Sequence, residues 1–364
     1  MSTLVETDVE TSPRPEVYAT SERVLVVDLQ STSPVWALPP SGAALLRASA
    51  PRGWRVEVLQ SPTVSDGDGN EAPSAESVAA VGGAEVYFGF GISRPLFAAG
   101  SGLRWVHSAA AGVGSALFPE MMASRVLFTN SAGVHAVPIA EHVTAGVLCL
   151  LRGFDIALDA QRAGRWDRAP FVRADTPVRE LGECRALVVG AGGIGAEVAR
   201  RLAAFGAYCV GLRRRPARGV PPGFARVNAL DALDEELPGA DILVLCAPLT
   251  PTTRGLLSAR RLARLPTHAI VVNVGRGALL DEEALAAQVR SGRLRGAVLD
   301  VFEREPLASA SALWQLRSVL VTPHVSAISP RRFWERELEL FLDNWRRYQR
   351  GEPLKNLVDK QAGY

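Results

Sequence analysis

The chain has 364 residues, of which 48% are hydrophobic and 21% charged, the balance expected of a protein with a large buried core. Two domains are the natural expectation at this length. Lysine and arginine number 40 against 38 acidic residues, and the net charge of +2 gives no chain-wide field that would favour binding of nucleic acid or an anionic membrane.

The cysteines are far apart in sequence and form no C-x-x-C pair. This spacing argues against a zinc site and against a disulfide framework, so no metal is predicted. A reducing, cytoplasmic setting is the interpretation we favour. The four residues are Cys149, Cys184, Cys209 and Cys246.

The N-terminal half begins with a polar segment and continues with a series of predicted strands. Residues 1–21 are acidic, contain no apolar signal core, and are expected to form a flexible tail. The segment 61–83 is turn-rich at its start and is interpreted as an exposed loop entering a helix. Five Val- and Leu-rich runs predict parallel α/β construction over residues 22–134. These runs lie at 23–29, 54–60, 84–90, 103–109 and 126–132.

An apolar helix is predicted from Ala136 to Arg152. It contains Pro138, Glu141 and His142, and it is too short and too interrupted to span a bilayer, so a buried helix is expected. Six further strand-like runs follow, and several end in Gly, Asp, Pro or His, where an open parallel sheet places its ligand-binding residues. These runs lie at 185–191, 207–212, 241–248, 269–275, 296–302 and 319–324.

The stretch SPRRFWERELELFLDNWRRYQRG, residues 329–351, has apolar residues at helical spacing and a glycine stop. We expect this helix to pack back on the first domain, which would make that domain discontinuous.

Gly190, Gly192 and Gly195 form a G-x-G-x-x-G pattern directly after a predicted strand and directly before a helical run. Glycines at these places permit a tight turn, allow backbone to approach a pyrophosphate, and let the helix pack on the strand, while the helix N-terminus favours the phosphate charge. The pattern alone is weak, and a glycine-rich turn is the alternative. With this strand–turn–helix context, it predicts a dinucleotide site.

Five blocks follow one another in the second half: VVGAGGIGAEVARRL, CAPLTPTTRGLLS, VVNVGRGALLDEEAL, GAVLDVFEREPL and VLVTPHVSAIS. Together they resemble the D-isomer-specific 2-hydroxyacid dehydrogenases. The resemblance extends into the first half through LRWVHSAAAGVG and TNSAGVHAVPIAEHV. It implies two Rossmann-like domains: a flavodoxin-like substrate domain at 22–134, completed by 326–364, and a doubly wound dinucleotide-binding domain at 135–325.

Reduction of a 2-oxo acid needs a cation for the carboxylate, a proton donor at the carbonyl oxygen and a hydride donor. The resemblance implies Arg276 as the cation and His324 as the proton donor. Glu305 would orient the imidazole and favour its protonated form. Spacing alone does not separate Glu303 from Glu305, and the family's acid precedes the proline, here Pro306. A surface arginine and a structural histidine are the ordinary alternatives for Arg276 and His324.

The resemblance also implies the remaining site residues. Ala111, Gly112 and Arg276 would bind the substrate, and Asp300 would accept a hydrogen bond from the nicotinamide carboxamide. The cofactor-binding residues are expected to be Gly190, Gly192, Gly193, Ile194, Gly195, Arg213, Arg214, Arg215, Cys246, Ala247, Pro248, Thr253, Val274 and Asp300. Structural roles are the better interpretation of the other histidines, which are His107, His135, His142 and His268.

Three arginines, Arg213 to Arg215, stand where the predicted strand YCVGL ends. An NAD-binding fold of this kind usually carries an acid there, which holds the ribose hydroxyls and would repel a 2′-phosphate. Arginine suits a phosphate dianion, so NADP is favoured over NAD, although a solvated basic loop is the alternative.

The leading hypothesis is a cytoplasmic, NAD(P)H-dependent reductase of a small 2-oxo acid such as glyoxylate or hydroxypyruvate. A corepressor-like protein that senses dinucleotides is an alternative, because such proteins share the fold. A biosynthetic reductase of a bulkier 2-oxo acid is another. The resemblance implies a homodimer built by the apolar helix and the arm GRWDR, residues 164–168, and the partners expected exclude nucleic acid and membrane.

Overall fold

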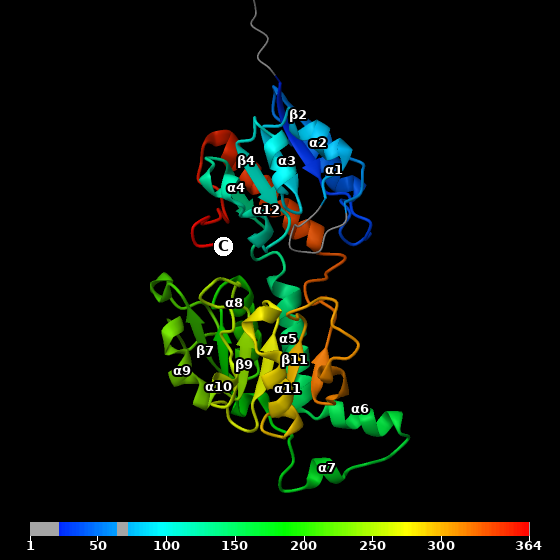
Figure 1. Ribbon diagram of the computed structural model, residues 1–364, viewed down its shortest axis with the longest axis vertical. Coiled ribbons are helices and arrows are strands. Elements are labelled where there is room, and N and C mark those ends of the chain that lie inside the picture. Colours follow the sequence, from blue (N-terminus) through cyan, green and yellow to red (C-terminus); the bar gives the residue numbers. More distant parts are fainter. Residues whose placement is uncertain (1–21, 64–71, 364) are drawn as a thin grey trace, which may run out of the picture.

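The computed structural model describes residues 22–63 and 72–363, which form two α/β lobes (Figure 1). The tail expected at 1–21 and the turn-rich part of the loop at 64–71 lie outside the described residues. Within the described ranges, no helix has both the length and the apolar character that a bilayer crossing requires.

The first lobe contains a five-stranded parallel sheet in the order β2-β1-β3-β4-β5. This is the flavodoxin-like order, in which the chain first adds strands on one side of β1 and then on the other. Its strands are β1 (Arg23–Asp28), β2 (Trp54–Val58), β3 (Val86–Gly89), β4 (Trp105–Ser108) and β5 (Leu127–Asn130).

Helices cover both faces of this sheet and bury its alternating apolar side chains. One layer contains α1 (Pro40–Ala48) and α12 (Phe333–Arg350). The opposite layer contains α2 (Ala75–Val81), α3 (Arg94–Ala99) and α4 (Pro119–Ala123). The first sheet is therefore covered on one side by a helix that follows the whole second lobe in sequence.

Helix α12 is held to the first sheet by aromatic and polar contacts. Phe341 stacks on Phe88 of β3, with ring centroids 3.9 Å apart. Glu337 and His107 of β4 are both fully buried, and Glu337 Oε1 lies 3.2 Å from His107 Nε2. The other imidazole nitrogen, Nδ1, lies 2.6 Å from the Thr129 hydroxyl on β5. His107 thus has a structural place, because both of its imidazole nitrogens contact buried partners within the first lobe.

The second lobe contains a seven-stranded parallel sheet in the order β12-β11-β10-β9-β6-β7-β8. The strand order reverses between β6 and β9, which is the switch point where a doubly wound sheet binds its ligand. The strands are β6 (Arg185–Val189), β7 (Tyr208–Arg213), β8 (Arg226–Ala229), β9 (Ile242–Leu245), β10 (Ile270–Asn273), β11 (Gly296–Leu299) and β12 (Val319–Val321).

The predicted α/β class with two Rossmann-like sheets is confirmed. Every strand expected from the sequence forms, and the structure contains one further strand, β8, that was not predicted. Its sequence RVNA has a single large apolar residue and it lies at the sheet edge, so it lacks the continuous apolar run that marks the buried strands.

The second sheet also lies between two helical layers. Helices α5 (Ala136–Leu151) and α8 (Gly193–Ala204) cover one face. Helices α9 (Leu233–Glu236), α10 (Ala259–Leu262) and α11 (Glu282–Arg290) cover the other. Short 3₁₀ turns link the elements of both lobes, at Gly114–Ala116, Leu181–Glu183, Pro216–Arg218, Leu230–Ala232, Leu237–Gly239, Gly277–Leu279 and Ala312–Gln315.

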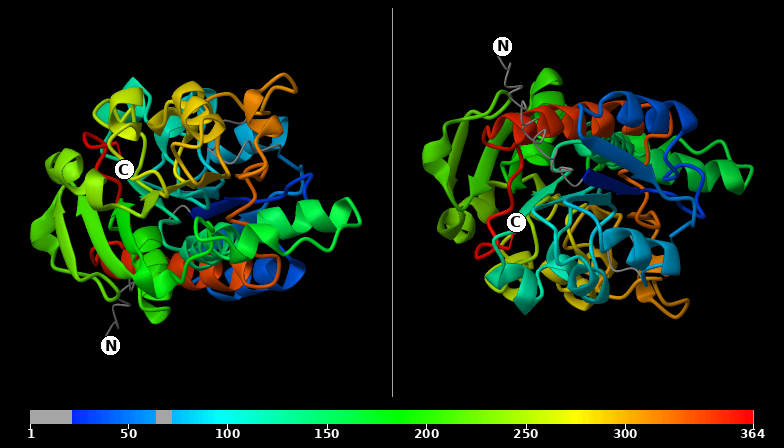
Figure 2. Two further views of the ribbon diagram at one scale, coloured as in Figure 1. Left: turned by 90° about the horizontal axis from the view of Figure 1, so that it is seen from below. Right: turned by 90° about the horizontal axis from the view of Figure 1, so that it is seen from above.

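Helices α6 (Phe154–Arg162) and α7 (Ala169–Val172) form an arm that projects away from both lobes. The views from below and above show α6 extending beyond the body of the protein (Figure 2). The arm includes GRWDR, and Trp166 within it is 93% exposed.

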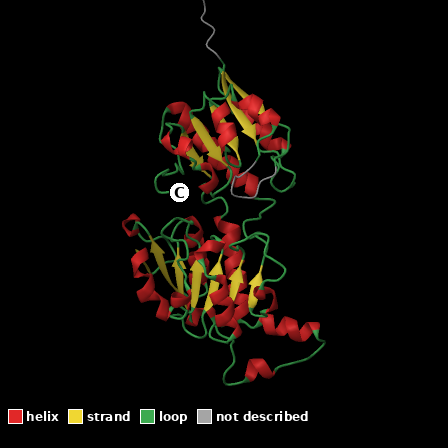
Figure 3. Ribbon diagram, viewed as in Figure 1, coloured by secondary structure: helices red, strands yellow, loops and turns green. Residues whose placement is uncertain are grey.

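The strands of the two sheets point toward each other, so both sets of carboxyl ends face the region between the lobes (Figure 3). The loops there are in close proximity: a Cβ placed on Gly193, at the start of α8, would lie 3.5 Å from Cα of Gly133, which follows β5. Residues from both lobes can therefore contribute to one site at this position.

Candidate active site

The glycine pattern lies between β6 and α8, at the switch point of the second sheet. Gly190 has φ +113°, and a Cβ there would lie 2.7 Å from the backbone nitrogen of Ala247. A Cβ on Gly195 would lie 2.2 Å from the Gly190 carbonyl oxygen, so the first turn of α8 packs directly on the loop. A Cβ on Gly192 meets nothing within 4 Å. This open space beside a helix N-terminus fits the approach of a dinucleotide pyrophosphate.

The neighbouring loop, after β9, completes this edge of the sheet. The Cys246 thiol donates to the Gly190 carbonyl at 3.3 Å, and burial raises its pKa to about 12, so it stays protonated. The Thr253 hydroxyl is buried and donates to the Pro248 carbonyl at 2.8 Å, which closes the loop on itself. Ile194 is half-buried and Val274, after β10, is buried. These contacts shape the loops, and the predicted contacts of these side chains with the cofactor stay a prediction.

Arg276 follows β10 and is half-buried. Its Nη1 donates to the Gly275 carbonyl at 2.7 Å, while the Asn273 side chain donates to the Arg276 carbonyl at 3.0 Å. Asn273 is fully buried, so a rigid strand end fixes the backbone of the arginine.

His324 and Glu305, predicted to act together, are in contact. Glu305 Oε2 lies 2.8 Å from His324 Nδ1, while its other oxygen accepts a hydrogen bond from Phe302 N–H at 2.9 Å. The imidazole and the carboxylate are each about one-third exposed, at 34% and 36%. This arrangement leaves Nε2 of the imidazole directed away from its carboxylate partner, as proton transfer to a substrate oxygen requires.

The backbone of His324 adopts φ +54°, in the left-handed region that non-glycine residues seldom occupy. Asp300, fully buried after β11, holds this conformation. Its carbonyl accepts a hydrogen bond from His324 N–H at 2.9 Å. Its carboxylate accepts from Thr322 at 2.6 Å and from the backbone N–H groups of Val325 and Ser326, both at 2.9 Å.

The expected contact of Asp300 with the nicotinamide stays a prediction, and its hydrogen bonds to the histidine loop were not predicted from the sequence. The pairing joins residues more than 20 positions apart, and no local pattern marks it. The signal available was weaker: a carboxylate that follows a buried parallel strand must find partners in the adjacent loop.

The three arginines at the end of β7 have different surroundings. Arg213 is half-buried, and its guanidinium donates to the carbonyls of Ala191 at 3.3 Å, Pro216 at 3.1 Å and Gly219. Arg214 and Arg215 are exposed, and Arg215 lies 3.2 Å from Asp359 of the first lobe. Arg213 therefore braces the glycine loop against the following turn, a task that the sequence analysis did not foresee.

Ala111 and Gly112 follow β4 of the first lobe, at its carboxyl end, and both are half-buried. The Asn130 side chain donates to the Ala111 carbonyl at 2.7 Å, which fixes this loop against the end of β5. The structure thus places the predicted substrate-binding residues on the same interlobe side as the histidine pair and the glycine loop.

A family model matches residues 144–326 of this chain. Its description is "D-isomer specific 2-hydroxyacid dehydrogenase, NAD binding domain". The chain belongs to the D-isomer specific 2-hydroxyacid dehydrogenases. It is accordingly an oxidoreductase that acts on 2-hydroxy acids with a nicotinamide cofactor.

Individual relatives of this dehydrogenase agree with the family assignment. A glyoxylate/hydroxypyruvate reductase A of Klebsiella pneumoniae (strain 342) is 34% identical over 271 residues, which cover 73% of this chain and 83% of the relative. The structure of a D-isomer specific 2-hydroxyacid dehydrogenase from Xanthobacter autotrophicus Py2, in complex with NADPH and MES, is 32% identical with a TM-score of 0.74 and covers 94% of this chain and 100% of that one. An NADPH-dependent glyoxylate/hydroxypyruvate reductase from Sinorhizobium meliloti is 28% identical with a TM-score of 0.72 and the same coverage.

The glycine loop of this dehydrogenase supports a paired test. Gly192→Ala is expected to leave the melting temperature unchanged, because its Cβ enters open space, and to weaken cofactor binding about tenfold or more by occupying that space. Gly195→Ala is expected to lower the melting temperature, since its Cβ would collide with the Gly190 carbonyl. Thermal unfolding and cofactor titration measure the two effects. Undiminished cofactor affinity in the Gly192 variant would contradict the assignment of this loop.

Proposed function

We propose that this dehydrogenase reduces a small 2-oxo acid to the D-2-hydroxy acid, with His324 as the proton donor and Arg276 as the carboxylate-binding cation. The observation that carries the proposal is the 2.8 Å contact between His324 and Glu305 at the carboxyl ends of the strands, the side on which the glycine loop also lies. A histidine paired with a carboxylate at a ligand-binding edge suits proton transfer better than a purely structural role.

The residues divide the reaction among them. Arg276 pairs with the substrate carboxylate and polarises the adjacent carbonyl, and the Ala111–Gly112 loop lies against the same carboxylate. His324 gives its proton to the carbonyl oxygen as the carbon accepts a hydride, and Glu305 stabilises the imidazolium before transfer. A bound nicotinamide supplies the hydride. The residues that would hold it are those of the glycine loop, the 246–253 loop and the end of β7.

Glyoxylate and hydroxypyruvate are the substrates we propose. The supporting observation is that relatives at 34% and 28% identity carry those substrates in their names. A screen of 2-oxo acids from two carbons to aromatic ones, followed through NADPH absorbance, tests this. Preference for an aromatic acid would favour the bulkier-substrate reductase, and tight cofactor binding without turnover on any acid would favour a dinucleotide sensor.

Substitution of either proposed catalytic side chain tests the roles. His324→Ala is expected to reduce turnover by about 10²–10⁴-fold by removing the proton donor. Arg276→Ala is expected to lose a comparable factor in kcat/KM because the carboxylate loses its partner. Steady-state kinetics measure both, and equilibrium cofactor titration should stay within about twofold of wild type. Wild-type turnover in either variant would remove the role assigned to that residue.

We further propose that the preferred cofactor is NADP. The first support is chemical: Arg213 stands at the end of β7, where NAD-specific folds carry a ribose-binding acid, and the two following arginines are exposed. The second is comparative, since the structures from X. autotrophicus and S. meliloti contain NADPH and NADP. Arg213 anchors the loop through backbone carbonyls, so the exposed Arg214 and Arg215 are the cations proposed for a 2′-phosphate, and Arg215 would exchange its pairing with Asp359 for the phosphate.

The cofactor proposal predicts that Arg213→Asp combined with Arg214→Ala raises the KM for NADPH at least about tenfold, because a repelling charge replaces a pair of cations. Steady-state kinetics with both cofactors provide the internal control. NADH kinetics report any damage to the loop that Arg213 braces, so the ratio of the two kcat/KM values isolates the phosphate effect. A wild-type preference for NADH that the double variant leaves unchanged would defeat the proposal.

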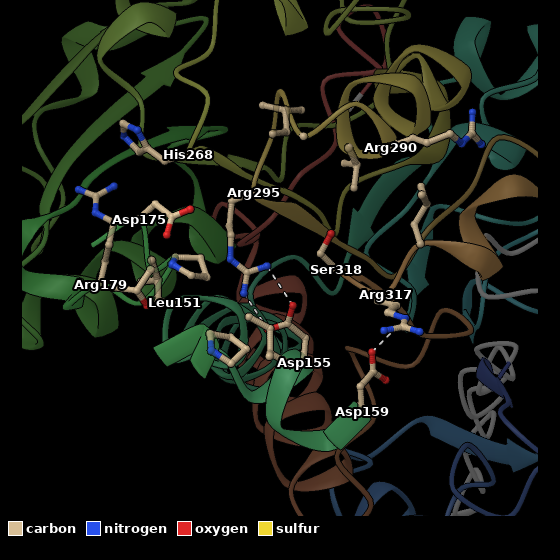
Figure 4. A pocket seen from close by; sticks show the side chains of 18 of the residues that line it. Leu151, Asp155, Asp159, Asp175, Arg179, His268, Arg290, Arg295, Arg317 and Ser318 are labelled. Atoms are coloured by element: carbon tan, nitrogen blue, oxygen red, sulfur yellow. Dashed lines mark hydrogen bonds and ion pairs between the residues drawn. The ribbon is translucent and has the colours of Figure 1, made fainter. Parts of the chain in front are cut away.

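We also propose that the enzyme is a homodimer in the reducing cytoplasm. The arm of α6 and α7 exposes three apolar side chains, Phe154, Trp166 and Val172, at 56%, 93% and 67%. Beside it lies a cavity of about 860 Å³, in which Arg295 pairs with Asp155 (Figure 4). A second copy's surface packed against this arm would bury these side chains.

The four free cysteines support the proposed reducing compartment, and cell fractionation would test it.

The dimer proposal predicts a light-scattering mass of twice the chain at micromolar concentration. Trp166→Ala should shift the protein toward the monomer, because the most exposed aromatic of the arm is lost. Phe205→Ala is the matched control, an equally aromatic change at an exposed position on the end of α8. A monomeric wild type would contradict the assembly.

A further inference from the structure

Glu282 connects α11 to the loop that carries Glu305. It occupies the first position of α11, after Asp281, which caps the helix by accepting from Ala284 N–H at 2.9 Å. The Glu282 side chain turns away from its own helix, and its Oε1 accepts a hydrogen bond from Glu303 N–H at 2.6 Å. A half-buried carboxylate thus contacts the backbone two residues before Glu305.

The same loop is also contacted by Gly277, the residue that follows Arg276. A Cβ placed on Gly277 would lie 1.8 Å from the carbonyl carbon of Phe302 and 2.2 Å from the Glu303 nitrogen. Only glycine permits this approach, so the segment from Arg276 to Gly277 and the 302–303 backbone are packed against each other. Because α11 begins five residues after Gly277, Glu282 contacts the same 302–303 backbone segment.

Hydrogen bonds connect the 302–303 backbone to the imidazole of His324. Phe302 N–H donates to Glu305 Oε1 at 2.9 Å, and Glu305 Oε2 lies 2.8 Å from His324 Nδ1. The order along this path is Glu282, the 302–303 backbone, Glu305 and His324. A displacement of the 302–303 backbone therefore moves the carboxylate that orients the proposed proton donor.

An acid in the first turn of a helix is ordinarily explained by the helix dipole, which favours the ionised form and lowers the pKa. The pKa of Glu282 is shifted in the opposite direction: burial raises it, the hydrogen bond from Glu303 N–H offsets part of this, and the negative charges of Glu303 and Glu305 raise it further. The ionised side chain is thus kept at a cost to stability. Charged groups retained in unfavourable surroundings are concentrated at functional sites.

We propose that Glu282 is a positioning residue of this enzyme: its carboxylate fixes the 302–306 loop through Glu303 N–H, and its charge, acting through Glu305, favours the protonated imidazole of His324. This inference rests on the proposed function, because it assumes that His324 donates the proton. It adds a residue that contacts neither substrate nor cofactor.

The charged groups around Glu282 and the histidine loop lie on two segments, which follow β10 and β11. Glu303 and Glu305 belong to the loop after β11, and Arg304 between them is exposed. Arg276 precedes the glycine that packs on this loop. Asp300 lies at the base of the His324 loop, where its carboxylate is occupied by three hydrogen bonds. Loss of the Glu282 charge thus changes the electrostatic balance around a site that also holds three other acids and two arginines, Arg276 and Arg304.

The test compares Glu282→Gln, which keeps an acceptor for Glu303 N–H and removes the charge, with Glu282→Ala, which removes both. Glu282→Gln should shift the alkaline limb of the kcat/KM profile to lower pH by about half a unit, with kcat at the optimum within about twofold of wild type. Glu282→Ala should also lower kcat by about tenfold or more, because the loop loses its tether. Cofactor affinity should be unchanged in both.

The melting temperature provides a second readout, in which Glu282→Gln is expected to stabilise the protein. A carboxyl group whose pKa is raised in the folded state costs stability above that pKa, and this cost disappears as the pH falls below the unfolded value near 4.5. Glu282→Gln should therefore raise the melting temperature at pH 8 by about 1–3 °C and leave it unchanged at pH 4. A purely structural acid would instead leave the pH profile unmoved.

Glu283→Gln is the matched control, since this neighbour on α11 is exposed and makes an identical change of charge. A pH profile of Glu282→Gln that coincides with that of the control would overturn the inference, as would wild-type kcat in Glu282→Ala. These failures are separable from failure of the proposed function. If wild type reduces a 2-oxo acid and His324→Ala does not, the proposed function stands whatever the Glu282 variants show.

Discussion

Strands that all run parallel end at the same edge of their sheet, and this constraint assembles the site from two lobes. In the second sheet it brings the glycine loop, Arg276 and the histidine loop to one edge, although they are separated by more than 130 residues from Gly190 to His324. In the first sheet it brings Ala111 to the facing edge. The side chains themselves add little to this placement, since the direction of the backbone determines where they meet.

The strand ends place the site residues near one another but do not fix the orientation of their side chains. Buried acids fix the orientation of His324 and of the neighbouring loop. Asp300 holds His324 in a left-handed backbone conformation through bonds to the surrounding loop. Glu282 and Gly277 fix the neighbouring loop from two sides. The proposed proton donor is thus oriented by carboxylates that lie outside the proposed substrate contacts, and rigid support of this kind is what reactive geometry requires.

Sequence patterns predicted the fold well, because the periodicity of apolar residues and the local composition are properties of short segments and can be read without knowing the tertiary structure. Apolar runs marked every buried strand, whereas the polar edge strand β8 had no such run and was missed. The contact of Glu305 with His324 was predicted by resemblance and forms, but spacing alone could not choose between Glu303 and Glu305. The clamp by Asp300 and the carbonyl partners of Arg213 were not predicted, because they depend on how loops distant in sequence settle against each other.

The return of α12 to the first sheet has a consequence for how the chain is made. A ribosome delivers β1 to β5 early, yet the helix whose Phe341 stacks on Phe88 emerges only after the whole second sheet. During that interval one face of the first sheet lacks its aromatic cover. By the time α12 is synthesised, the second lobe has all its strands and can close around its own core. The lobe that is synthesised first is therefore completed last, and it is the nascent first lobe that needs protection from aggregation.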